Sequence, residues 1–272
     1  MSTVQEVVTE APTLDAVPKK AMTLGYGTSL VILALLIIVP LFVKNFIIFQ
    51  LTMLLIYALA VLALNILTGG SGQFSLGQSA FYAVGAYTSA ILMEHADINY
   101  VLTLPIAGII CFGFGFLFGQ PALRLSGVYL ALATFALATA MPQLLKLGVF
   151  EHWTGGVQGL VVTKPDAPFG LHISQDMWLY YFTLVISIAI YIFSVNLLKS
   201  RSGRAFMAIR DNEIAASAMG IDVALYKTLA FGVSAGITGV AGALGAIAVQ
   251  FVAPDSYTIT FAISLFLGMV VG

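Results

Sequence analysis

The stretch Arg201-Ser-Gly-Arg-Ala-Phe-Met-Ala-Ile-Arg-Asp-Asn-Glu-Ile-Ala-Ala-Ser-Ala-Met-Gly220 decides how this chain folds. It is the most charged island after the N-terminal tail, and apolar runs long enough to cross a bilayer flank it on both sides. Residues 204–219 are predicted to form one helix, and Gly220 follows where helices commonly stop. The pattern therefore predicts a short surface helix between two membrane spans, available to a soluble partner.

The composition is that of a membrane protein. Of the 272 residues, 60% are hydrophobic and 8% are charged, and the mean hydropathy is +1.02. A soluble domain carries roughly 25% charged residues, because its surface must stay in water. Lipid must therefore cover much of this chain. The net charge of -1 argues against a nucleic-acid partner, and the single cysteine, Cys111, excludes an intrachain disulfide framework.

Eight apolar runs are candidates for membrane-spanning helices, which need about 20 apolar residues each. They cover residues 24–43, 46–67, 79–93, 101–120, 128–147, 178–198, 226–249 and 259–272. We predict an all-α polytopic bundle of about eight spans: a disordered tail over residues 1–23 and a transmembrane domain over 24–272 with a polar loop at 199–226. The last run reaches Gly272 without a polar exit, so we expect the chain to be cut short there.

The distribution of basic residues predicts the orientation in the membrane. Only three lysines fall in the loops on one side of the predicted bundle, whereas the other side receives Lys19, Lys20, Arg124, Lys199, Arg201, Arg204, Arg210 and Lys227. Because cytoplasmic loops carry the excess of lysine and arginine, we expect the N-terminus and the 199–226 loop to be cytoplasmic. The chain is thus predicted to be a multi-pass protein of a bacterial inner membrane.

Two glycine-rich stretches interrupt the apolar pattern. The first predicts a broken or re-entrant segment, whose freed backbone groups could contact a zwitterionic ligand; an ordinary tight turn is the alternative. The second lies in an outward loop, where it could line the mouth of a pathway, contact a delivery protein or form a plain solvated loop. The candidate pathway residues are Gly69, Gly70, Gly72, Gln73, Ser75, Gly77 and Gln78 in the first stretch and Thr154, Gly155 and Gly156 in the second.

The sequence holds no constellation of catalytic residues. His95, His152 and His172 are scattered without metal-ligand spacing, and no pair of carboxylates lies within a span. The absence of a Gly-x-x-x-x-Gly-Lys-Ser/Thr loop indicates that the chain does not bind nucleotide itself. We therefore predict a protein that is not an enzyme and that binds no cofactor or metal.

Four stretches resemble, in order, the LivM-type permeases of branched-chain amino acid ABC importers. They are Gly72-Gln-Phe-Ser-Leu-Gly-Gln-Ser-Ala-Phe-Tyr-Ala-Val-Gly-Ala-Tyr-Thr88, Ser126-Gly-Val-Tyr-Leu-Ala-Leu-Ala-Thr-Phe-Ala136, Thr154-Gly-Gly-Val-Gln-Gly-Leu160 and residues 203–222 of the polar island. The resemblance implies an all-helical permease half that pairs with a second permease in the lipid bilayer. Two cytoplasmic ATP-binding subunits would use the ATP, and a periplasmic substrate-binding protein would deliver the amino acid.

The same resemblance implies roles for particular residues. The island would be the coupling helix that enters a cleft of an ATPase, and the two glycine-rich stretches would face the translocation path. The implied coupling residues are Arg204, Arg210, Asp211, Asn212, Glu213, Ala215, Ala216, Met219 and Gly220. The family normally continues through a further glycine-rich stretch and at least one more span, and this chain stops at Gly272.

Other interpretations of the sequence remain open. Relatives of such permeases import urea, short amides or other amino acids, and the chain carries no residue that separates them. A secondary transporter driven by an ion gradient is disfavoured by the scarcity of charge within the spans. A membrane scaffold whose cytoplasmic helix recruits a soluble protein would leave the glycine-rich stretches unexplained. A surface helix that only rests on lipid headgroups would explain the amphipathic pattern and basic residues of the island, but less well the cluster Asp211-Asn212-Glu213 and the run of small residues.

Overall fold

The computed structural model describes residues 26–122, 127–165 and 174–271. The chain divides into two compact units, one up to Val43 and one from Lys44 onward, and each is described by itself. The first unit contains α1 (Tyr26–Ile38) and the short 3-10 helix η2 (Val39–Leu41). The predicted tail over residues 1–23 lies outside the described residues.

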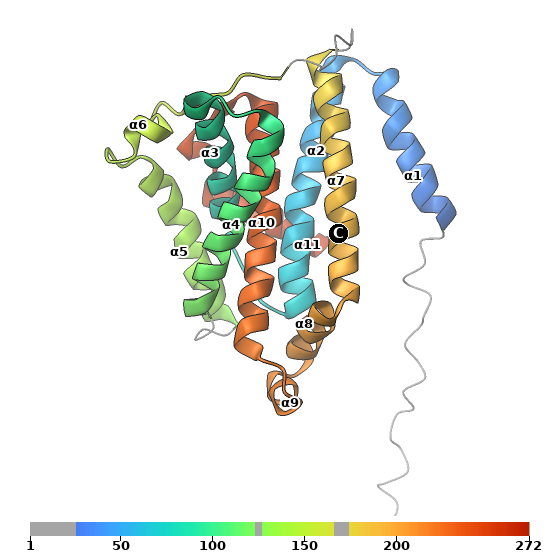
Figure 1. Ribbon diagram of the computed structural model, residues 1–272, viewed down its shortest axis with the longest axis vertical. Helices are drawn as coiled ribbons and strands as arrows, with labels where there is room; N and C mark the ends of the chain where they lie inside the picture. The colour runs from blue at the N-terminus through green and yellow to red at the C-terminus, as the bar shows by residue number, and fades with distance from the viewer. Residues whose placement is uncertain (1–25, 123–126, 166–173, 272) are drawn as a thin grey trace, which may run out of the picture. The chain divides into compact units, whose positions relative to one another are not determined.

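The second unit is a bundle of helices (Figure 1). Its elements are α2 (Asn45–Asn65), the π-helical turn η3 (Ile66–Gly70), α3 (Gln78–Ala96), α4 (Tyr100–Ala122), α5 (Val128–Leu145), α6 (Glu151–Thr154), β1 (Leu160–Val161), α7 (Gln175–Lys199), α8 (Arg201–Asp211), α9 (Glu213–Ala218), α10 (Val223–Val249), β2 (Phe251–Val252), η5 (Pro254–Ser256) and α11 (Ile259–Val271). The prediction of an all-helical chain is confirmed for the described residues, apart from one antiparallel pair of two-residue strands, β1 and β2.

Each of the eight predicted apolar runs contains one helix. Among the described residues, five helical segments are long and apolar enough to cross a membrane: Asn45–Gly70, Tyr100–Gln120, Gln175–Lys199, Val223–Val249 and Pro254–Val271. Helix α3 is not one of them. Its polar residues Gln78, Ser79 and Ser89 are buried inside the bundle, so the bundle rather than lipid surrounds this helix.

Helix α10 is the centre of the bundle, with α2, α3 and α4 packed around it (Figure 1). Glycines allow the backbones to approach closely. A Cβ atom on Gly85 of α3 would lie 2.1 Å from the carbonyl oxygen of Gly239 in α10. A Cβ on Gly242 would lie 2.1 Å from the carbonyl oxygen of Tyr82. Membrane helices commonly pack through such small residues.

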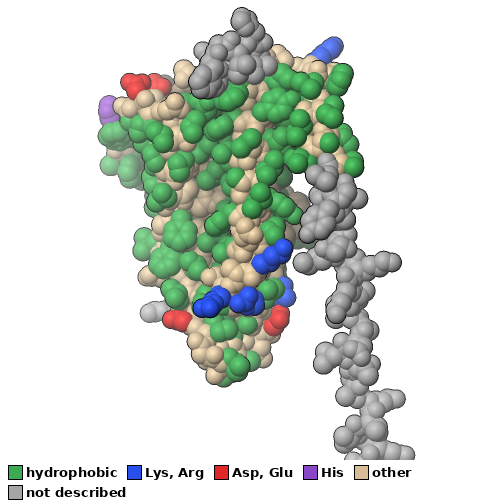
Figure 2. Space-filling view, turned by 45° about the vertical axis from the view of Figure 1, so that its right-hand side comes forward, with side chains coloured by type: hydrophobic (Ala, Val, Ile, Leu, Met, Phe, Trp, Pro, Cys, Tyr) green, Lys and Arg blue, Asp and Glu red, His purple; other side chains and the backbone are tan. Residues whose placement is uncertain are grey.

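The surface of this unit separates hydrophobic and basic side chains. Figure 2 shows a mostly hydrophobic band, with Lys and Arg side chains gathered toward the lower end of the view. Ile109 and Leu117 of α4 are 71% and 63% exposed, as expected of side chains that face lipid. Lys199, Arg201 and Arg204, where α7 meets α8, are exposed.

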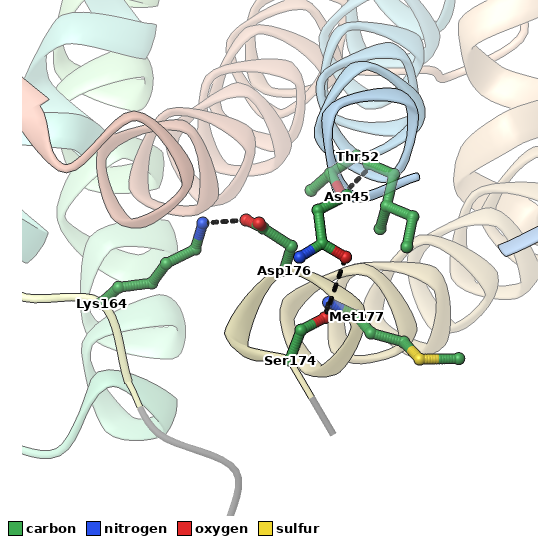
Figure 3. Close-up of polar contacts among 7 residues, drawn as sticks. Asn45, Thr52, Lys164, Ser174, Asp176 and Met177 are labelled. Atoms are coloured by element: carbon green, nitrogen blue, oxygen red, sulfur yellow. Dashed lines mark hydrogen bonds and ion pairs between the residues drawn. The ribbon is translucent and has the colours of Figure 1, made fainter. Parts of the chain in front are cut away.

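The ends of α2 and α7 farthest from α8 are fixed to each other by polar contacts (Figure 3). Ser174 caps α7, because its Oγ accepts a hydrogen bond from the backbone N–H of Met177 at 3.3 Å. The same hydroxyl donates to Oδ1 of Asn45 at the start of α2. Lys164 and Asp176 form an ion pair beside them. We call this the α6 end of the bundle, and the opposite end the α8–α9 end.

Candidate functional site at the break between α2 and α3

The glycine-rich stretch after α2 leaves the helical path. Residues 66–70 form a π-helical turn, and residues 72–77 belong to no helix. Gly72 has φ +73°, a left-handed conformation that glycine adopts without steric cost. Two side chains add hydrogen bonds to backbone carbonyl groups here: Ser71 Oγ donates to the Leu67 oxygen at 2.7 Å, and Thr68 Oγ1 donates to the Gln73 oxygen at 3.1 Å.

The polar island contacts this break directly. Nη1 of Arg210, in the last turn of α8, donates a hydrogen bond to the carbonyl oxygen of Gly69 at 2.7 Å. The guanidinium group also pairs with Asp211 at 3.2 Å. A Cβ atom on Gly72 would lie 3.0 Å from Cγ of Arg210, so the arginine stem packs on the glycine backbone. The polar island and the first glycine-rich stretch, which are separate features of the sequence, are therefore in direct contact in the fold.

A second contact reaches the break from α10. Nε2 of Gln73 donates to the carbonyl oxygen of Lys227 at 3.2 Å and to Ser71 Oγ at 2.9 Å. The ammonium group of Lys227 pairs with the carboxylate of Glu213, the first residue of α9. We call the Arg210–Gly69, Gln73–Lys227 and Lys227–Glu213 contacts together the clamp. The clamp connects α8, α9 and α10 to the break.

Helix α5 contributes a third contact. The backbone N–H of Leu76 donates to Oγ1 of Thr134 at 2.9 Å. A Cβ atom on Gly77 would lie 3.2 Å from Cβ of Thr134, so the two backbones approach closely. Thr134 belongs to the 126–136 stretch that carried part of the family resemblance. Three of the four resembling stretches thus meet at the break.

A buried polar network anchors the far side of the break, where α3 begins. Gln78 donates from Nε2 to Ser234 Oγ at 2.8 Å, and Thr238 Oγ1 donates to Gln78 Oε1 at 2.8 Å. Ser234 Oγ donates to the carbonyl oxygen of Ala63 at 2.7 Å. The three side chains are at most 1% exposed. Because buried polar groups need hydrogen-bond partners, this network fixes α3 against α2 and α10.

The polar groups of three predicted pathway residues are therefore bonded within the chain. Gln73, Ser75 and Gln78 are buried, and Ser75 Oγ accepts a hydrogen bond from the Gly77 N–H at 3.2 Å. Gly72 is exposed at the surface of the break. In this arrangement the glutamines and the serine hold the shape of the break, and among residues 70–77 only Gly72 and Phe74 are exposed.

The prediction of one continuous helix over residues 204–219 is wrong. Helix α8 ends at Asp211 and α9 begins at Glu213, because Asn212 has an extended backbone with φ −161° and ψ 110°. Its side chain caps α9 by accepting a hydrogen bond from the Ala215 N–H at 3.0 Å. Asparagine favours such caps over helix interiors, since its amide competes for backbone groups.

The predicted helix stop at Gly220 is confirmed. Gly220 has φ +81°, and its N–H donates to the Ser217 oxygen at 3.0 Å. The next N–H, of Ile221, donates to the Ala216 oxygen at 3.1 Å. This pair of bonds is the Schellman motif, in which a left-handed glycine satisfies the last carbonyl groups of a helix.

The tip formed by α9 exposes apolar side chains. Ile214 and Met219 are 82% and 84% exposed, whereas Ala216 is buried against the bundle. The other predicted coupling residues are exposed, and they are Arg204, Arg210, Asp211, Asn212, Glu213, Ala215 and Gly220. Of these, Arg204 donates only within its own loop, from Nη1 to the Lys199 oxygen at 3.2 Å. The tip is thus a small apolar surface flanked by charges.

The second glycine-rich stretch forms an ordered turn at the α6 end. Thr154 Oγ1 donates to the Leu145 oxygen at 2.9 Å and accepts from the Gly156 N–H at 3.2 Å. Gly155 and Gly156 both have positive φ, at +69° and +56°. The turn leads into β1, which pairs with β2 directly after α10. Thr154, Gly155 and Gly156 therefore lie at the opposite end of the bundle from the clamp (Figure 1).

The comparison with known families decides what this arrangement belongs to. A family described as the branched-chain amino acid transport system / permease component matches residues 46–272. The chain belongs to this family. With five helices that can cross a membrane, it is a multi-pass membrane protein. The four resembling stretches lie within the matched residues, so the family resemblance drawn from them is confirmed.

Curated relatives agree with the family match. The "High-affinity branched-chain amino acid transport system permease protein LivM" of Salmonella typhimurium and that of Escherichia coli are each 35% identical over 239 residues, which cover 79% of this chain and 55% of the relative. A "Probable branched-chain amino acid transport permease protein LivM" of Methanocaldococcus jannaschii is 27% identical over 145 residues, or 53% of this chain and 41% of the relative. The chain spans about half the length of the curated relatives it matches. No solved structure matches it.

The sequence alone did not indicate several of the residues that contact the break or fix α3 beside it. Ser234 and Thr238 lie four residues apart in an apolar run, and that one-turn spacing is a signal for a shared helix face. Thr134 and Lys227 carry no such signal, because only the folded chain brings them to the break. At the α6 end, His95 Nε2 lies 3.2 Å from the His152 oxygen, although the sequence presents these histidines as scattered. No group of three metal-ligating side chains occurs among the described residues, and His172 is not among these residues.

Proposed function

We propose that the chain is the transmembrane permease subunit of an ATP-binding-cassette importer for branched-chain or other hydrophobic amino acids, driven by separate ATPase subunits. The observation that carries the proposal is the hydrogen bond from Arg210 to Gly69, which joins the polar island to the glycine-rich break. The family match and the printed names of the relatives supply the substrate class.

In the membrane, the α8–α9 end faces the cytoplasm, and each of the eight apolar runs crosses the inner membrane, with the 79–93 run surrounded by the bundle rather than by lipid. The exposed Lys199, Arg201 and Arg204 support this orientation, since cytoplasmic ends of membrane proteins are rich in basic residues. The N-terminus is assigned to the same side because Lys19 and Lys20 precede the first apolar run. The break enters the bundle from the cytoplasmic side as a re-entrant segment, and its exposed backbone at Gly72 faces the translocation path.

The α9 tip binds an ATPase subunit. Ile214 and Met219 suit an apolar groove, and the short helix length suits insertion between two lobes of a soluble protein. A second permease subunit completes the membrane part, and a periplasmic binding protein delivers the amino acid at the α6 end. This chain binds no nucleotide or other cofactor, and the partner subunits use the ATP.

Nucleotide-driven movement of the ATPases reaches the break through the clamp. Displacement of α9 pulls on Lys227 through Glu213, and displacement of α8 pulls on Gly69 through Arg210. The break in turn is joined to α3 and α10 by Gln73 and by the Gln78 network. The helices that surround the path therefore move with the ATPases.

A docking variant tests this function. In the natural host, we expect the double substitution Ile214→Asp and Met219→Asp to abolish leucine uptake and copurification of the ATPase subunits, because buried carboxylates would be left without partners. The protein should still insert into the membrane. Val149→Asp is the matched control: Val149 is 84% exposed at the α6 end, so ATPase copurification should not change. Leucine uptake that persists in the double variant, or that continues when the ATPases are inactivated, would overturn the proposal.

A further inference from the structure

A small cavity of about 100 Å³ lies among α2, α3, α10 and α11. Its walls are mainly aromatic: Tyr57 from α2, Tyr82 from α3, Tyr257 after η5 and Phe261 from α11. The Tyr82 ring lies 5.0 Å from the Phe261 ring and 5.7 Å from the Tyr257 ring, centroid to centroid. These rings are close enough to form one continuous apolar wall.

The cavity also has polar atoms. A Cβ atom on Gly245 would lie 2.0 Å from Oη of Tyr82, so this hydroxyl points at the glycine that lines the cavity. Ser256 contributes a second hydroxyl to the lining. Beside it, Oη of Tyr87 is buried without a hydrogen-bond partner among the described residues, and the Tyr87 ring lies 6.3 Å from that of Tyr257. Apolar walls with a few hydroxyl groups fit a small molecule that is itself part apolar and part polar.

The cavity lies between the two glycine-rich stretches. Tyr82 follows Gln78 by one turn of α3, or about 6 Å along the helix axis. On the other side, Phe251 of β2 lines the cavity. Phe251 pairs with Val161 of β1. Residues 157–159 separate strand β1 from the Thr154–Gly156 turn. The cavity is thus linked to both glycine-rich stretches, through α3 on one side and through the β1–β2 pair on the other.

We propose that this cavity binds the aliphatic side chain of the transported amino acid. The proposal rests on the proposed function and adds the site at which the substrate is recognised inside the membrane. The aromatic walls accept a branched alkyl group, and the tyrosine and serine hydroxyls are available to the ammonium or carboxylate group. An apolar pocket of fixed size discriminates substrates by about 10–200-fold per methylene group.

A larger groove, of about 360 Å³, does not fit this substrate. It lies among α4, α7 and α10, and its lining residues, such as Phe112 and Phe193, are all apolar. Ile109 at its edge is 71% exposed on the surface that faces lipid. A zwitterion would find no polar partner there, whereas lipid acyl chains would fill it.

Photo-leucine, a leucine with a photoactivated diazirine in its side chain, tests the cavity. The gene is expressed in its natural host with its partner subunits, the cells are irradiated during uptake, and the labelled peptides are mapped by mass spectrometry. We expect the label on peptides that contain Tyr82, Tyr257 or Phe261. Gly245→Ala places a methyl group where the Tyr82 hydroxyl lies, so the tyrosine must move and the cavity changes shape, and this should reduce the labelling by about tenfold. Gly113→Ala is the control, because a Cβ on Gly113 meets nothing within 4 Å.

A second measurement covers the case in which Gly245→Ala does not fold. Phe261→Trp enlarges the wall from the α11 side, so it should lower the ratio of leucine to valine uptake by about fivefold, since valine is one methylene smaller. Label that maps to other helices, or that is equally strong in Gly245→Ala, while leucine uptake continues would overturn the cavity proposal alone. A wild-type chain that takes up no leucine would overturn the proposed function and the cavity with it.

Discussion

The hydrogen bond from Arg210 to Gly69 offers a way to separate docking of the ATPase from transmission of its movement. Arg210→Met keeps the apolar stem that packs on Gly72 and removes the guanidinium group that donates at 2.7 Å. A hydrogen bond from a charged donor contributes about 1.5–3 kcal/mol when it is buried. The Arg210 side chain is 45% exposed. Solvent screening therefore reduces this contribution to about 1 kcal/mol.

That energy sets the size of the expected effect. If the bond holds the break to α8 in the ATP-driven states, a loss of about 1 kcal/mol lowers the population of correctly coupled states by about fivefold. Amino-acid uptake per ATP hydrolysed should fall by the same factor. Copurification of the ATPase subunits should not change, because Ile214 and Met219 at the α9 tip are untouched.

The assay uses the transporter, reconstituted in vesicles with its partner subunits, with uptake and ATP hydrolysis measured on the same sample. Arg204→Met is the matched control, since Arg204 is exposed on the same helix and donates only to Lys199 of its own loop. It should keep the wild-type ratio of uptake to hydrolysis. The reasoning is refuted if Arg210→Met also keeps that ratio, or if it releases the ATPases in the way that the docking variant does.

Three further substitutions test the contacts that surround the break. Gly85→Ala should lower the stability of the purified protein by about 1–3 kcal/mol, because the backbone of Gly239 cannot move away from the added methyl group. Gly113→Ala adds a methyl group in open space and should leave the stability unchanged. Thermal unfolding in detergent compares the two variants. Asn212→Ala removes the cap of α9, which contributes about 1 kcal/mol to the stability of the helix. ATPase copurification should therefore weaken by about fivefold. Unchanged copurification would mean that the cap has no part in docking. Gln78→Leu removes two neutral hydrogen bonds and should lower the free energy of unfolding by about 2 kcal/mol. Amino-acid uptake should fall as well. A variant as stable as the wild type would contradict the role of the buried network.

The helical bundle could be predicted because its determinants are local in sequence. An apolar run of about 20 residues must satisfy its own backbone in lipid, and a helix is the way a single segment does so. For this reason all eight runs contain helices. The end of the helix at Gly220 could also be predicted, since a glycine after a run of alanines commonly ends a helix. The break at Gly69–Gly77 was visible as a loss of the apolar pattern.

The contacts at the break could not be predicted, because they depend on the packing of separate helices. Nothing in the sequence around Thr134 indicates that its hydroxyl binds the N–H of Leu76. The division of the polar island at Asn212 was missed for a different reason. The alanines on both sides favour a helix, and the preference of one asparagine for a cap outweighed them. The pathway residues Gln73 and Gln78 looked available to a ligand, since their burial is a property of the folded bundle alone.

The chemistry of these contacts changes with depth, and this agrees with the proposed drive by separate ATPase subunits rather than by an ion gradient. At the α8–α9 end the break is contacted by the charged side chain of Arg210 and by the backbone carbonyl of Lys227, whose ammonium group pairs with Glu213. About two turns further along α10, the contacts involve Ser234 and Gln78, which are buried and uncharged. Charges within a bilayer are costly, so a protein driven by an ion gradient would place carboxylates at this depth. Hydrogen bonds between amide and hydroxyl groups carry no ion, but they can transmit a displacement that begins at the α9 tip.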